Sequence, residues 1–342
     1  MKLTRGLIGI LFLSFSLPVM AQDKLIFAID IIRHGDRNPA IEFSGGSVEW
    51  PGGLGELTPA GMLQEYQLGA TLRKKYVDEY HLLPKLYQFD MMTVRSTNVN
   101  RTLMSAESFL YGLYPVNFGA TPLPFGYQPI PIHTVKKEDE DLLIPDQNRT
   151  RMAILLARYV WFTHAWRAKN AELKSFYPRW SALTGVSIHN LLNVLEVGDN
   201  LYIRQLRHKP FPKGMSAAEG QQIITAAEWA FLYLFSQRPV GLSTMHNLLV
   251  QITTSFHTAV AGQSPLKYIL YSGHDSTITA VLSALGAPVS TIPGYASDLN
   301  FSLFKNDRNE PYIVTSLNGQ VISLPGCAEG RCSLAQFEQL TR

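Results

Sequence analysis

A chain of 342 residues is long enough for one large domain or two smaller ones, and 46% hydrophobic with 11% aromatic residues can fill a substantial core. This composition excludes an intrinsically disordered protein. The formal net charge is only +3, so the chain lacks the strong basic excess of a nucleic-acid-binding protein, and no nucleic-acid partner is expected.

The first 21 residues have the features of a secretory signal peptide. Lys2 and Arg5 precede an apolar stretch from Leu7 to Val19, and Val19-Met20-Ala21 has the small-residue pattern of a cleavage site, so we expect cleavage after Ala21. The alternative is a membrane anchor, but the stretch is shorter than the ~20 apolar residues that span a bilayer. Cleavage would remove two of the 30 basic and none of the 27 acidic residues. We therefore expect a nearly neutral, exported protein, periplasmic or secreted, without a stable membrane anchor.

The chain has two cysteines, Cys327 and Cys332. In an oxidising compartment they are expected to form a disulfide, although closing so small a loop contributes only roughly 2 kcal/mol by loss of chain entropy. A two-cysteine metal site is the weaker alternative because no histidine lies nearby. The disulfide would therefore order the C-terminal tail and would not hold the fold together.

The apolar run from Leu25 to Ile32 predicts a buried strand. It is followed directly by Arg33-His34-Gly35-Asp36-Arg37-Asn38-Pro39, which would lie at the carboxyl end of that strand, where open α/β sheets bind their ligands. Thr58-Pro59-Ala60-Gly61 has the pattern of an N-cap with proline at the first helical position, and predicts a helix through about Tyr76.

A second strand is predicted around residues 89–94, and the composition of residues 98–104 is that of a helix start, which places Arg101 in the first turns. Beyond it, long helical patterns with few strand candidates predict an all-helical insertion. We place this insertion at residues 131–239, between the two parts of an α/β domain at 22–130 and 240–342. The charge run at 136–141 is expected to be a solvated turn or helix start.

The strand, turn and helix pattern recurs after the insertion. Residues 268–271 predict a strand, Ser272-Gly273-His274-Asp275 a sharp turn, and the following residues a helix. Residues 299–304, 312–317 and 321–324 predict antiparallel strands, with Asn318-Gly319 as a tight hairpin turn. The predicted fold class is therefore α/β, a mixed and mostly parallel central sheet flanked by helices, with an inserted all-helical subdomain.

Basic residues gather at three of the predicted strand-to-helix turns, and turns at one sheet edge converge in space. A phosphate that binds without a metal ion needs several donors in fixed geometry, and arginine supplies planar pairs of donors that remain charged. We predict that Arg33, Arg37 and Arg101 form a phosphate clamp. Arg95 would support Arg101 from behind.

His34 is the candidate nucleophile, because a neutral imidazole can attack phosphorus and form a phosphohistidine. The attacking nitrogen must be unprotonated, so the other ring nitrogen is expected to donate its proton to an acceptor such as a nearby backbone carbonyl. His274 would donate to the phosphate oxygens. Asp275 would protonate the departing alkoxide and then, as a carboxylate, activate the hydrolytic water.

Each of these signals is weak by itself. An Arg-His pair is more often a surface feature, and a His-Asp pair is more often a helix cap; only their joint placement at three turns favours catalysis. His246 and His257 fall on a predicted amphipathic helix and are expected to be structural, not metal ligands. Asp36 either pairs with an arginine or simply begins the loop, and the sequence leaves both open.

The motifs resemble those of the histidine acid phosphatases, branch 2 of the histidine phosphatase superfamily, whose motifs are Arg-His-Gly-x-Arg-x-Pro and His-Asp. Residues 33–39 and 274–275 fit both, and residues 57–62, 95–106 and 324–327 also resemble the prostatic and lysosomal acid phosphatases. The resemblance covers nearly the whole mature chain. It implies an α/β domain with a helical insertion, and no metal or organic cofactor. It also implies His34 as the phosphorylated nucleophile, Asp275 as the proton donor, and Arg33, Arg37, Arg101 and His274 as phosphate ligands.

Three positions depart from the related phytases. These usually carry an apolar residue in place of Asp36, a threonine in place of Ala40 and an asparagine in place of Thr277, so the chain is closer to the general phosphatases. The animal enzymes use more cysteines, which favours a bacterial exported member. The resemblance leaves the oligomeric state open, with a homodimer as one option.

The sequence thus predicts an exported, metal-independent acid phosphatase that hydrolyses small phosphate monoesters with broad specificity. The nearest alternative is a phytase or sugar-phosphatase of the same superfamily. From a different class, a catalytically inactive phosphate- or phospholipid-binding protein would keep the arginines but would have little use for His34 together with Asp275.

Overall fold

The computed structural model describes residues 23–44, 48–115 and 128–342. The expected signal peptide, residues 1–21, lies outside these ranges. Among the helices of the described ranges, none is long and apolar enough to cross a membrane.

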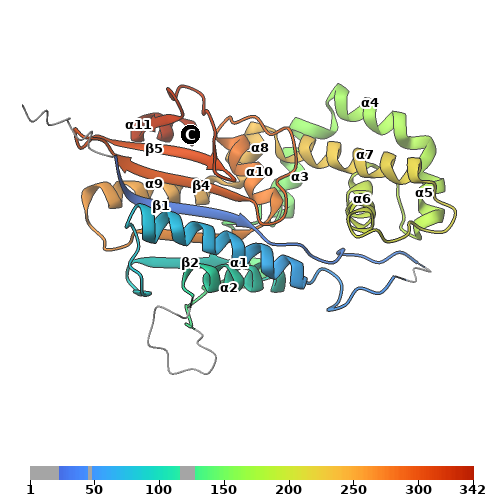
Figure 1. Ribbon diagram of the computed structural model, residues 1–342. Coiled ribbons are helices and arrows are strands. Elements are labelled where there is room, and N and C mark those ends of the chain that lie inside the picture. Colours follow the sequence, from blue (N-terminus) through green and yellow to red (C-terminus); the bar gives the residue numbers. More distant parts are fainter. Residues whose placement is uncertain (1–22, 45–47, 116–127) are drawn as a thin grey trace, which may run out of the picture.

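A seven-stranded mixed sheet, flanked by helices, makes up the part of the molecule at the left of Figure 1. In spatial order its strands are β2 (Met92–Ser96), β3 (Tyr268–Gly273), β1 (Lys24–Arg33), β4 (Asp298–Lys305), β5 (Pro311–Leu317) and β6 (Gln320–Val321), and β7 (Arg331–Ser333) also pairs with β5. The strands β2, β3 and β1 run parallel to one another, whereas the remaining pairings are antiparallel. The predicted mixed sheet is confirmed.

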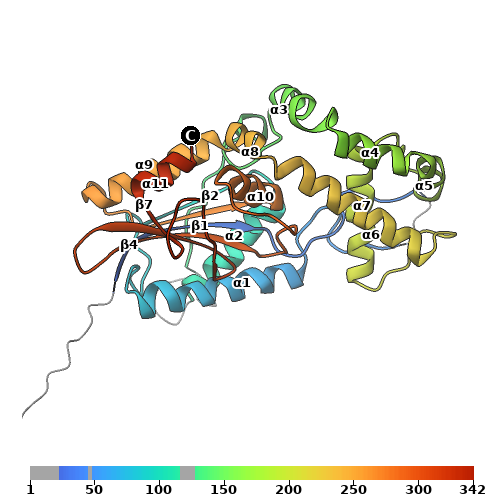
Figure 2. The same cartoon turned by 90° about the horizontal axis from the view of Figure 1, so that it is seen from above.

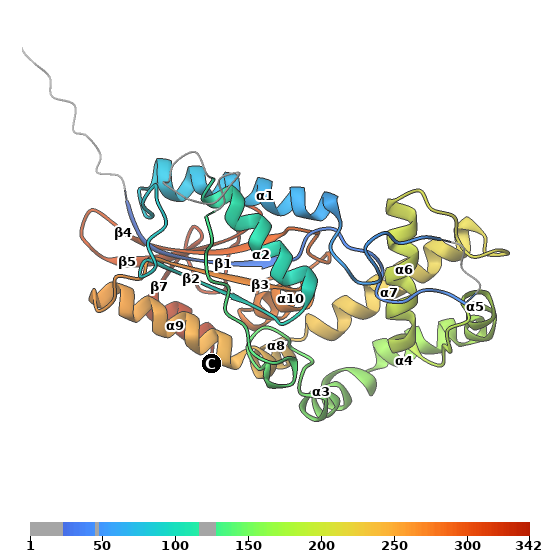
Figure 3. The ribbon, with the colours of Figure 1, turned by 90° about the horizontal axis from the view of Figure 1, so that it is seen from below.

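Helices cover both faces of this sheet (Figures 1 and 3). One face carries α1 (Pro59–Arg73) and α2 (Asn100–Leu113). The other carries α8 (Arg238–Thr244), α9 (His246–Ala261), α10 (Asp275–Ala284) and α11 (Leu334–Leu340). Short π-helical or 3₁₀ turns occur at Lys74–Glu79, Lys137–Asp139, Ala157–Trp161 and Lys174–Phe176.

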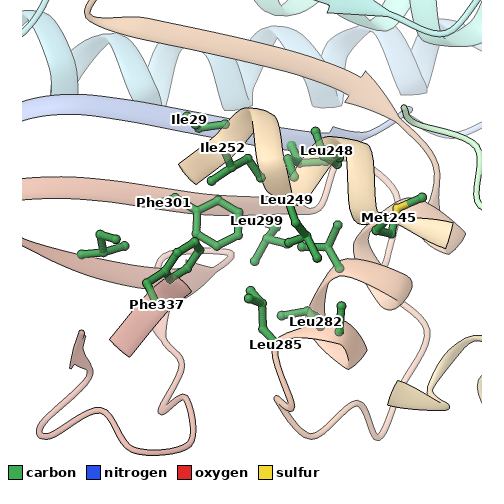
Figure 4. Packing of buried hydrophobic residues seen from close by; sticks show 14 of the residues in the cluster. Ile29, Met245, Leu248, Leu249, Ile252, Leu282, Leu285, Leu299, Phe301 and Phe337 are labelled. Atoms are coloured by element: carbon green, nitrogen blue, oxygen red, sulfur yellow. The ribbon is translucent and has the colours of Figure 1, made fainter. Parts of the chain in front are cut away.

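Alternate side chains of β1 enter two different hydrophobic clusters. Phe27, Ile29 and Ile31 pack with residues of α9, α10 and α11, a packing that Figure 4 shows in part. Ala28 and Ile32 pack with residues of α1 and α2 on the opposite face. Because both faces of β1 are buried, its sequence is a nearly continuous apolar run and not an alternating one.

A group of helices lies beyond one end of the sheet (Figures 1 and 2). It comprises α3 (Arg149–Leu156), α4 (His164–Leu173), α5 (Tyr177–Thr184), α6 (Leu191–Leu206) and α7 (Ala217–Phe235). These helices have a hydrophobic cluster of their own, which includes Trp180, Leu191 and Leu201. The domain boundaries at residues 131 and 239 stay a prediction; His133 still pairs with Arg95 of β2.

The C-terminal region follows the predicted pattern in part: β4 and β5 lie where strands were expected, but the strand expected at 321–324 is only the short β6 at Gln320–Val321. Cys327 and Cys332 form a disulfide. Asn318 and Gly319 join β5 to β6 with φ angles of 51° and 77°, the left-handed conformation that a tight two-residue hairpin turn requires.

Candidate active site

The three predicted motifs follow the carboxyl ends of three adjacent parallel strands. His34 comes directly after β1, His274 directly after β3, and Arg101 lies in the first turn of α2, shortly after β2. The backbone N–H of His34 donates to the carbonyl of Gly273 at 3.1 Å, which joins the ends of β1 and β3. The strand order β2-β3-β1 therefore brings the motifs to one edge of the sheet, as predicted.

A cavity of about 500 Å³ lies at this edge. Five of the predicted site residues line it: His34, Arg37, Arg101, His274 and Asp275. The rest of its wall comes from Val99, Lys137, Glu138, Ile144, Asp146, Gln147, Arg149 and Ser276. The charge run at 136–141 is therefore more than a solvated turn, because two of its residues border the cavity.

The loop after β1 packs directly on the start of α1. A Cβ atom at Gly35 would lie 2.4 Å from the carbonyl oxygen of Gly61, and one at Gly61 would lie 2.3 Å from the carbonyl oxygen of Asp36, so only glycine fits at either position. Thr58 caps α1 by accepting from the N–H of Gly61 at 3.1 Å, and its hydroxyl donates to Asp36 Oδ2 at 2.6 Å. These contacts hold the backbone beside His34.

His34 is buried, and its Nδ1 lies 2.9 Å from the carbonyl oxygen of Gly35. A carbonyl can only accept, so Nδ1 carries the proton and Nε2 keeps a free lone pair. Burial lowers the pKa of His34 well below its ordinary value, and the positive charges of Arg33 and Arg101 lower it further. Burial among positive charges therefore favours the neutral imidazole of His34, the form that can attack phosphorus.

Two of the three clamp arginines are paired with carboxylates. Arg33 Nη2 lies 2.8 Å from Asp275 Oδ2, and its guanidinium stacks over the ring of Tyr295 at 4.4 Å from the ring centre. Arg37 donates from Nη1 and Nη2 to the two carboxylate oxygens of Asp199, at 2.9 and 3.0 Å. Both pairs hold a guanidinium in a fixed plane at the edge of the sheet.

Arg101 forms no ion pair with the described residues. Burial and the nearby Arg37 lower its pKa to about 10, so it remains protonated at acid and neutral pH. The Nε atoms of Arg33, Arg37 and Arg101 are buried and make no hydrogen bond to the described protein groups. A buried donor without a partner is costly, and these unpartnered donors suit an oxyanion; Arg37 and Arg101 line the cavity, whereas Arg33 is not part of its wall.

His274 and Asp275 begin α10. His274 Nε2 is hydrogen-bonded to the hydroxyl of Thr97 at 3.1 Å, and burial with the charge of Arg101 lowers the pKa of His274 to about 3. For Asp275, burial by itself would raise the pKa, but the attraction of Arg33 outweighs it and the pKa lies below the ordinary value. Asp275 is thus an ion-paired carboxylate, not the carboxylic acid that the predicted proton donor would need.

Arg95 and Asp36 both form ion pairs with residues that the sequence did not single out. Arg95 pairs with Glu140 at 2.6 Å and so holds the segment after residue 139 against β2. Asp36 does pair with an arginine, but the partner is Arg207, at 2.7 Å, which follows α6. Of the histidines expected to be structural, His257 contacts Glu338 on α11, and His246 is exposed at the start of α9.

Sequence reasoning missed the contributions of the helical region to this site. Asp199 binds Arg37, and Arg207 donates to Asp36 Oδ2, to Asn38 Oδ1 at 2.6 Å and to the carbonyl of Arg37 at 2.6 Å. Neither residue belongs to a recognisable motif, and both lie more than 160 positions along the chain from their partners. No local pattern could have identified them.

Comparison with known proteins assigns the family. The family model of the histidine phosphatase superfamily (branch 2) matches residues 24–318. The chain belongs to branch 2 of the histidine phosphatase superfamily. Within it, the lysosomal acid phosphatase of Xenopus laevis is 32% identical over 98% of this chain and 80% of its own length. The prostatic acid phosphatase of Bos taurus is 31% identical over 93% of this chain and 84% of its own length. The chain is therefore a histidine acid phosphatase, a phosphomonoesterase.

Solved structures of this fold include two phytases. That of Citrobacter braakii gives a TM-score of 0.67 at 18% identity and covers 93% of this chain and 97% of its own. That of Hafnia alvei, in complex with tartrate, gives a TM-score of 0.68 at 17% identity and covers 95% of this chain and 97% of its own. At these identities the likeness shows a shared fold and does not assign a substrate.

Proposed function

We propose that this histidine acid phosphatase is exported, needs no metal ion, and hydrolyses small phosphate monoesters of broad specificity through a phosphohistidine on His34. The observation that carries the proposal is the buried imidazole of His34, whose Nδ1 is bonded to the Gly35 carbonyl and which lines one cavity with two arginines of the clamp, Arg37 and Arg101. Export rests on the signal-peptide pattern of residues 1–21.

In this mechanism the phosphate oxygens bind the clamp arginines, and His274 donates to them from Nε2, which in the free protein is hydrogen-bonded to the Thr97 hydroxyl. The bond between Nε2 of His34 and phosphorus forms as the bond to the leaving oxygen breaks. Negative charge on the equatorial oxygens is stabilised by Arg33, Arg37 and Arg101, whose buried Nε–H groups need an acceptor. Because the ionised donors are already in place, little reorganisation is needed when the charge develops.

Asp275 has two roles that follow one another. In the free protein it is held as a carboxylate by Arg33. A phosphate that binds Arg33 weakens that pairing and adds a second negative charge, so the pKa of Asp275 rises and it can hold the proton that the leaving alkoxide takes. As a carboxylate again, Asp275 accepts a proton from the water that attacks the phosphohistidine.

A phytase is the second candidate. Lys137 and Arg149 line the cavity and would suit the additional phosphates of an inositol polyphosphate. Glu138 and Asp146 line the same cavity with opposite charge and would repel them. A phosphate-binding protein without activity is disfavoured, since binding alone does not require a neutral buried histidine beside a carboxylate.

The decisive experiment traps the covalent intermediate. The mature protein is mixed with ³²P-labelled phenyl phosphate near pH 5 and denatured rapidly in base, in which phosphohistidine is stable. We expect a base-stable, acid-labile label on the peptide that contains His34. His34→Ala should lose the label and at least about 10³-fold in kcat. The matched control, His246→Ala at the exposed start of α9, should keep both. Substantial turnover by His34→Ala would overturn the proposal.

A further inference from the structure

Helix α6 is the structural support of the phosphate-binding loop. The segment after β1 passes along this helix (Figure 3), and four side chains of α6 or its C-terminal end bind it. The contacts are Asp199 to Arg37, Asn200 to the carbonyl of Ile41 at 2.7 Å, Arg204 to Glu42 at 2.6 Å, and Arg207 to Asp36. Of these four residues, Asp199 binds the guanidinium of Arg37, whereas Arg207 reaches only the backbone carbonyl of that residue.

The pair of Arg37 and Asp199 is bidentate and largely shielded from water. The side chain of Arg37 is 11% exposed and that of Asp199 is 26% exposed. With both carboxylate oxygens bound, Asp199 cancels the charge of Arg37 but does not bind its Nε–H, which has no hydrogen-bond partner among the described residues. Asp199 therefore changes the charge of the phosphate site and leaves a donor in place.

The formal charges of the three clamp arginines and their carboxylate partners sum to one positive unit. Asp275 balances Arg33, Asp199 balances Arg37, and Arg101 has no ion-pair partner among the described residues. Burial and the surrounding guanidiniums lower the pKa of His34 and that of His274, the latter to about 3, and so favour the neutral form of both rings. A phosphate monoester has its second pKa near about 6, so at pH 5 it is mostly a monoanion and at pH 7 mostly a dianion. One positive charge balances the monoanion.

We propose that Asp199 is a specificity-determining residue of the phosphate site: by neutralising Arg37 it restricts the site to phosphate monoesters that carry a single negative charge. This inference rests on the proposed function and names the ionic form of its substrate. A singly charged substrate also supplies the proton that Asp275 needs. The monoanion, ROPO₃H⁻, brings one proton on phosphate; Asp275 takes it and passes it to the leaving oxygen. The phosphorylated His34 and ROH are then formed without any other acid.

Other ionisable groups surround Arg37 and Asp199. They come from every segment packed on the pair and are Asp36, Arg33, Arg101, Asp275, Arg207 and Tyr295. Burial raises the pKa of Tyr295 to about 12, so this phenol is neutral throughout. Arg207 is paired with Asp36. Neither Arg101, whose pKa is lowered to about 10, nor Tyr295 titrates between pH 5 and 7, so we expect the ligand's own ionisation to decide the charge balance at the clamp.

Inorganic phosphate and sulfate test directly whether the site prefers a singly charged ligand, because they have nearly the same shape and differ in charge. At pH 5 phosphate is a monoanion and sulfate a dianion. Isothermal titration calorimetry on the intact mature protein should show that phosphate binds at least about tenfold more tightly than sulfate at pH 5. As the pH is raised to 8 and phosphate becomes a dianion, its advantage over sulfate should disappear. A wild-type protein without this discrimination would overturn the proposal.

Asp199→Asn keeps the shape and an oxygen acceptor for Arg37 but removes the charge. We expect its preference for phosphate over sulfate at pH 5 to fall at least about tenfold. Asp199→Glu, which keeps the charge, should retain the preference. The matched control is Glu196→Gln, an equal change of charge on the exposed surface of the same helix, which should behave as wild type. An unchanged preference in Asp199→Asn, or an equal loss in Glu196→Gln, would overturn the role of Asp199.

Failure of this inference is distinguishable from failure of the proposed function. The two anions are measured by binding and need no turnover, whereas the function is tested by the label on His34. A preference for phosphate over sulfate without a label on His34 would leave Asp199 as a determinant of a binding site and overturn the phosphatase mechanism. A label on His34 without a preference for phosphate over sulfate would keep the mechanism and overturn the role of Asp199.

Discussion

One ion pair decides how the carboxyl group of the site can act. Arg33 holds Asp275 as a carboxylate, and the pKa of Asp275 lies below its ordinary value although the group is buried. A group whose pKa is lowered on folding stabilises the protein above its unfolded pKa, and this contribution is lost as the pH falls through the folded value. Proton donation by Asp275 therefore requires substrate, whose charge weakens the attraction of Arg33.

Replacement of Asp275 tests this role. Asp275→Asn should slow hydrolysis of alkyl phosphates by about 10²-fold more than that of p-nitrophenyl phosphate, because nitrophenolate leaves with little protonation. The measurement is kcat for both substrates near pH 5. The control is Asp146→Asn, a second carboxyl group of the same cavity, which should affect both substrates alike. Equal losses on the two substrates in Asp275→Asn would argue against proton donation.

At the scale of elements, the parallel strands place the motifs and a distant helix completes them. The ends of β2, β3 and β1 gather His34, Arg101 and His274 at one edge. The loop between β1 and α1 has a close glycine contact on one side and α6 on the other. Its conformation therefore depends on two elements that are far apart in the sequence.

Arg207 is the main polar link between α6 and this loop. Its guanidinium donates to Asp36, Asn38 and the carbonyl of Arg37, a pattern that the single ammonium of lysine does not reproduce. Arg207→Lys should lower the free energy of unfolding by about 2 kcal/mol and weaken phosphate binding. Urea unfolding and calorimetry give the two quantities. Arg179→Lys, in an exposed pair with Glu219, should change neither. Stability and affinity at wild-type values in Arg207→Lys would show that α6 does not hold the loop.

At the scale of the whole molecule, buried carboxyl groups favour stability in acid. Burial raises the pKa of Glu65 well above its ordinary value, and the Ser105 hydroxyl offsets only part of this effect. Burial and the nearby Asp30 likewise raise the pKa of Asp298. A carboxyl group whose pKa is raised on folding adds no pH-dependent penalty to the stability while it is protonated in both the folded and the unfolded protein. Its penalty grows as the pH rises from the unfolded pKa through the folded one. These groups therefore make the fold more stable near pH 4 than at pH 7.

Removal of one such group should flatten this dependence. Glu65→Gln should stabilise the protein at pH 7 by on the order of 1 kcal/mol relative to wild type and have little effect at pH 4. Urea unfolding at the two pH values measures the difference. Glu107→Gln, on the exposed surface of α2, is the matched control and should give the same stability change at both pH values. A change in Glu65→Gln that does not depend on pH would contradict the argument.

Much of the fold could be predicted because its signals are local. The apolar run of β1, the Thr58-Pro59 start of α1 and the Asn318-Gly319 hairpin depend on side chains and backbone angles within a few residues. Boundaries were less accurate: the strand expected at residues 89–94 is found at Met92–Ser96. A shift of this size is expected, because tertiary pairing and not propensity ends a strand.

By itself, the sequence determined which residue types stand at the ends of the parallel strands, and thereby the family and its candidate nucleophile and arginines. Only the tertiary structure decided their charge and partners. It pairs Asp275 with Arg33, places the Gly35 carbonyl at His34 Nδ1, and brings Asp199 and Arg207 to the loop after β1. The physical reason is that strand ends follow from local hydrophobic pattern and parallel topology. An ion pair between residues 162 positions apart depends instead on how α6 is rotated and packed, which no local pattern encodes.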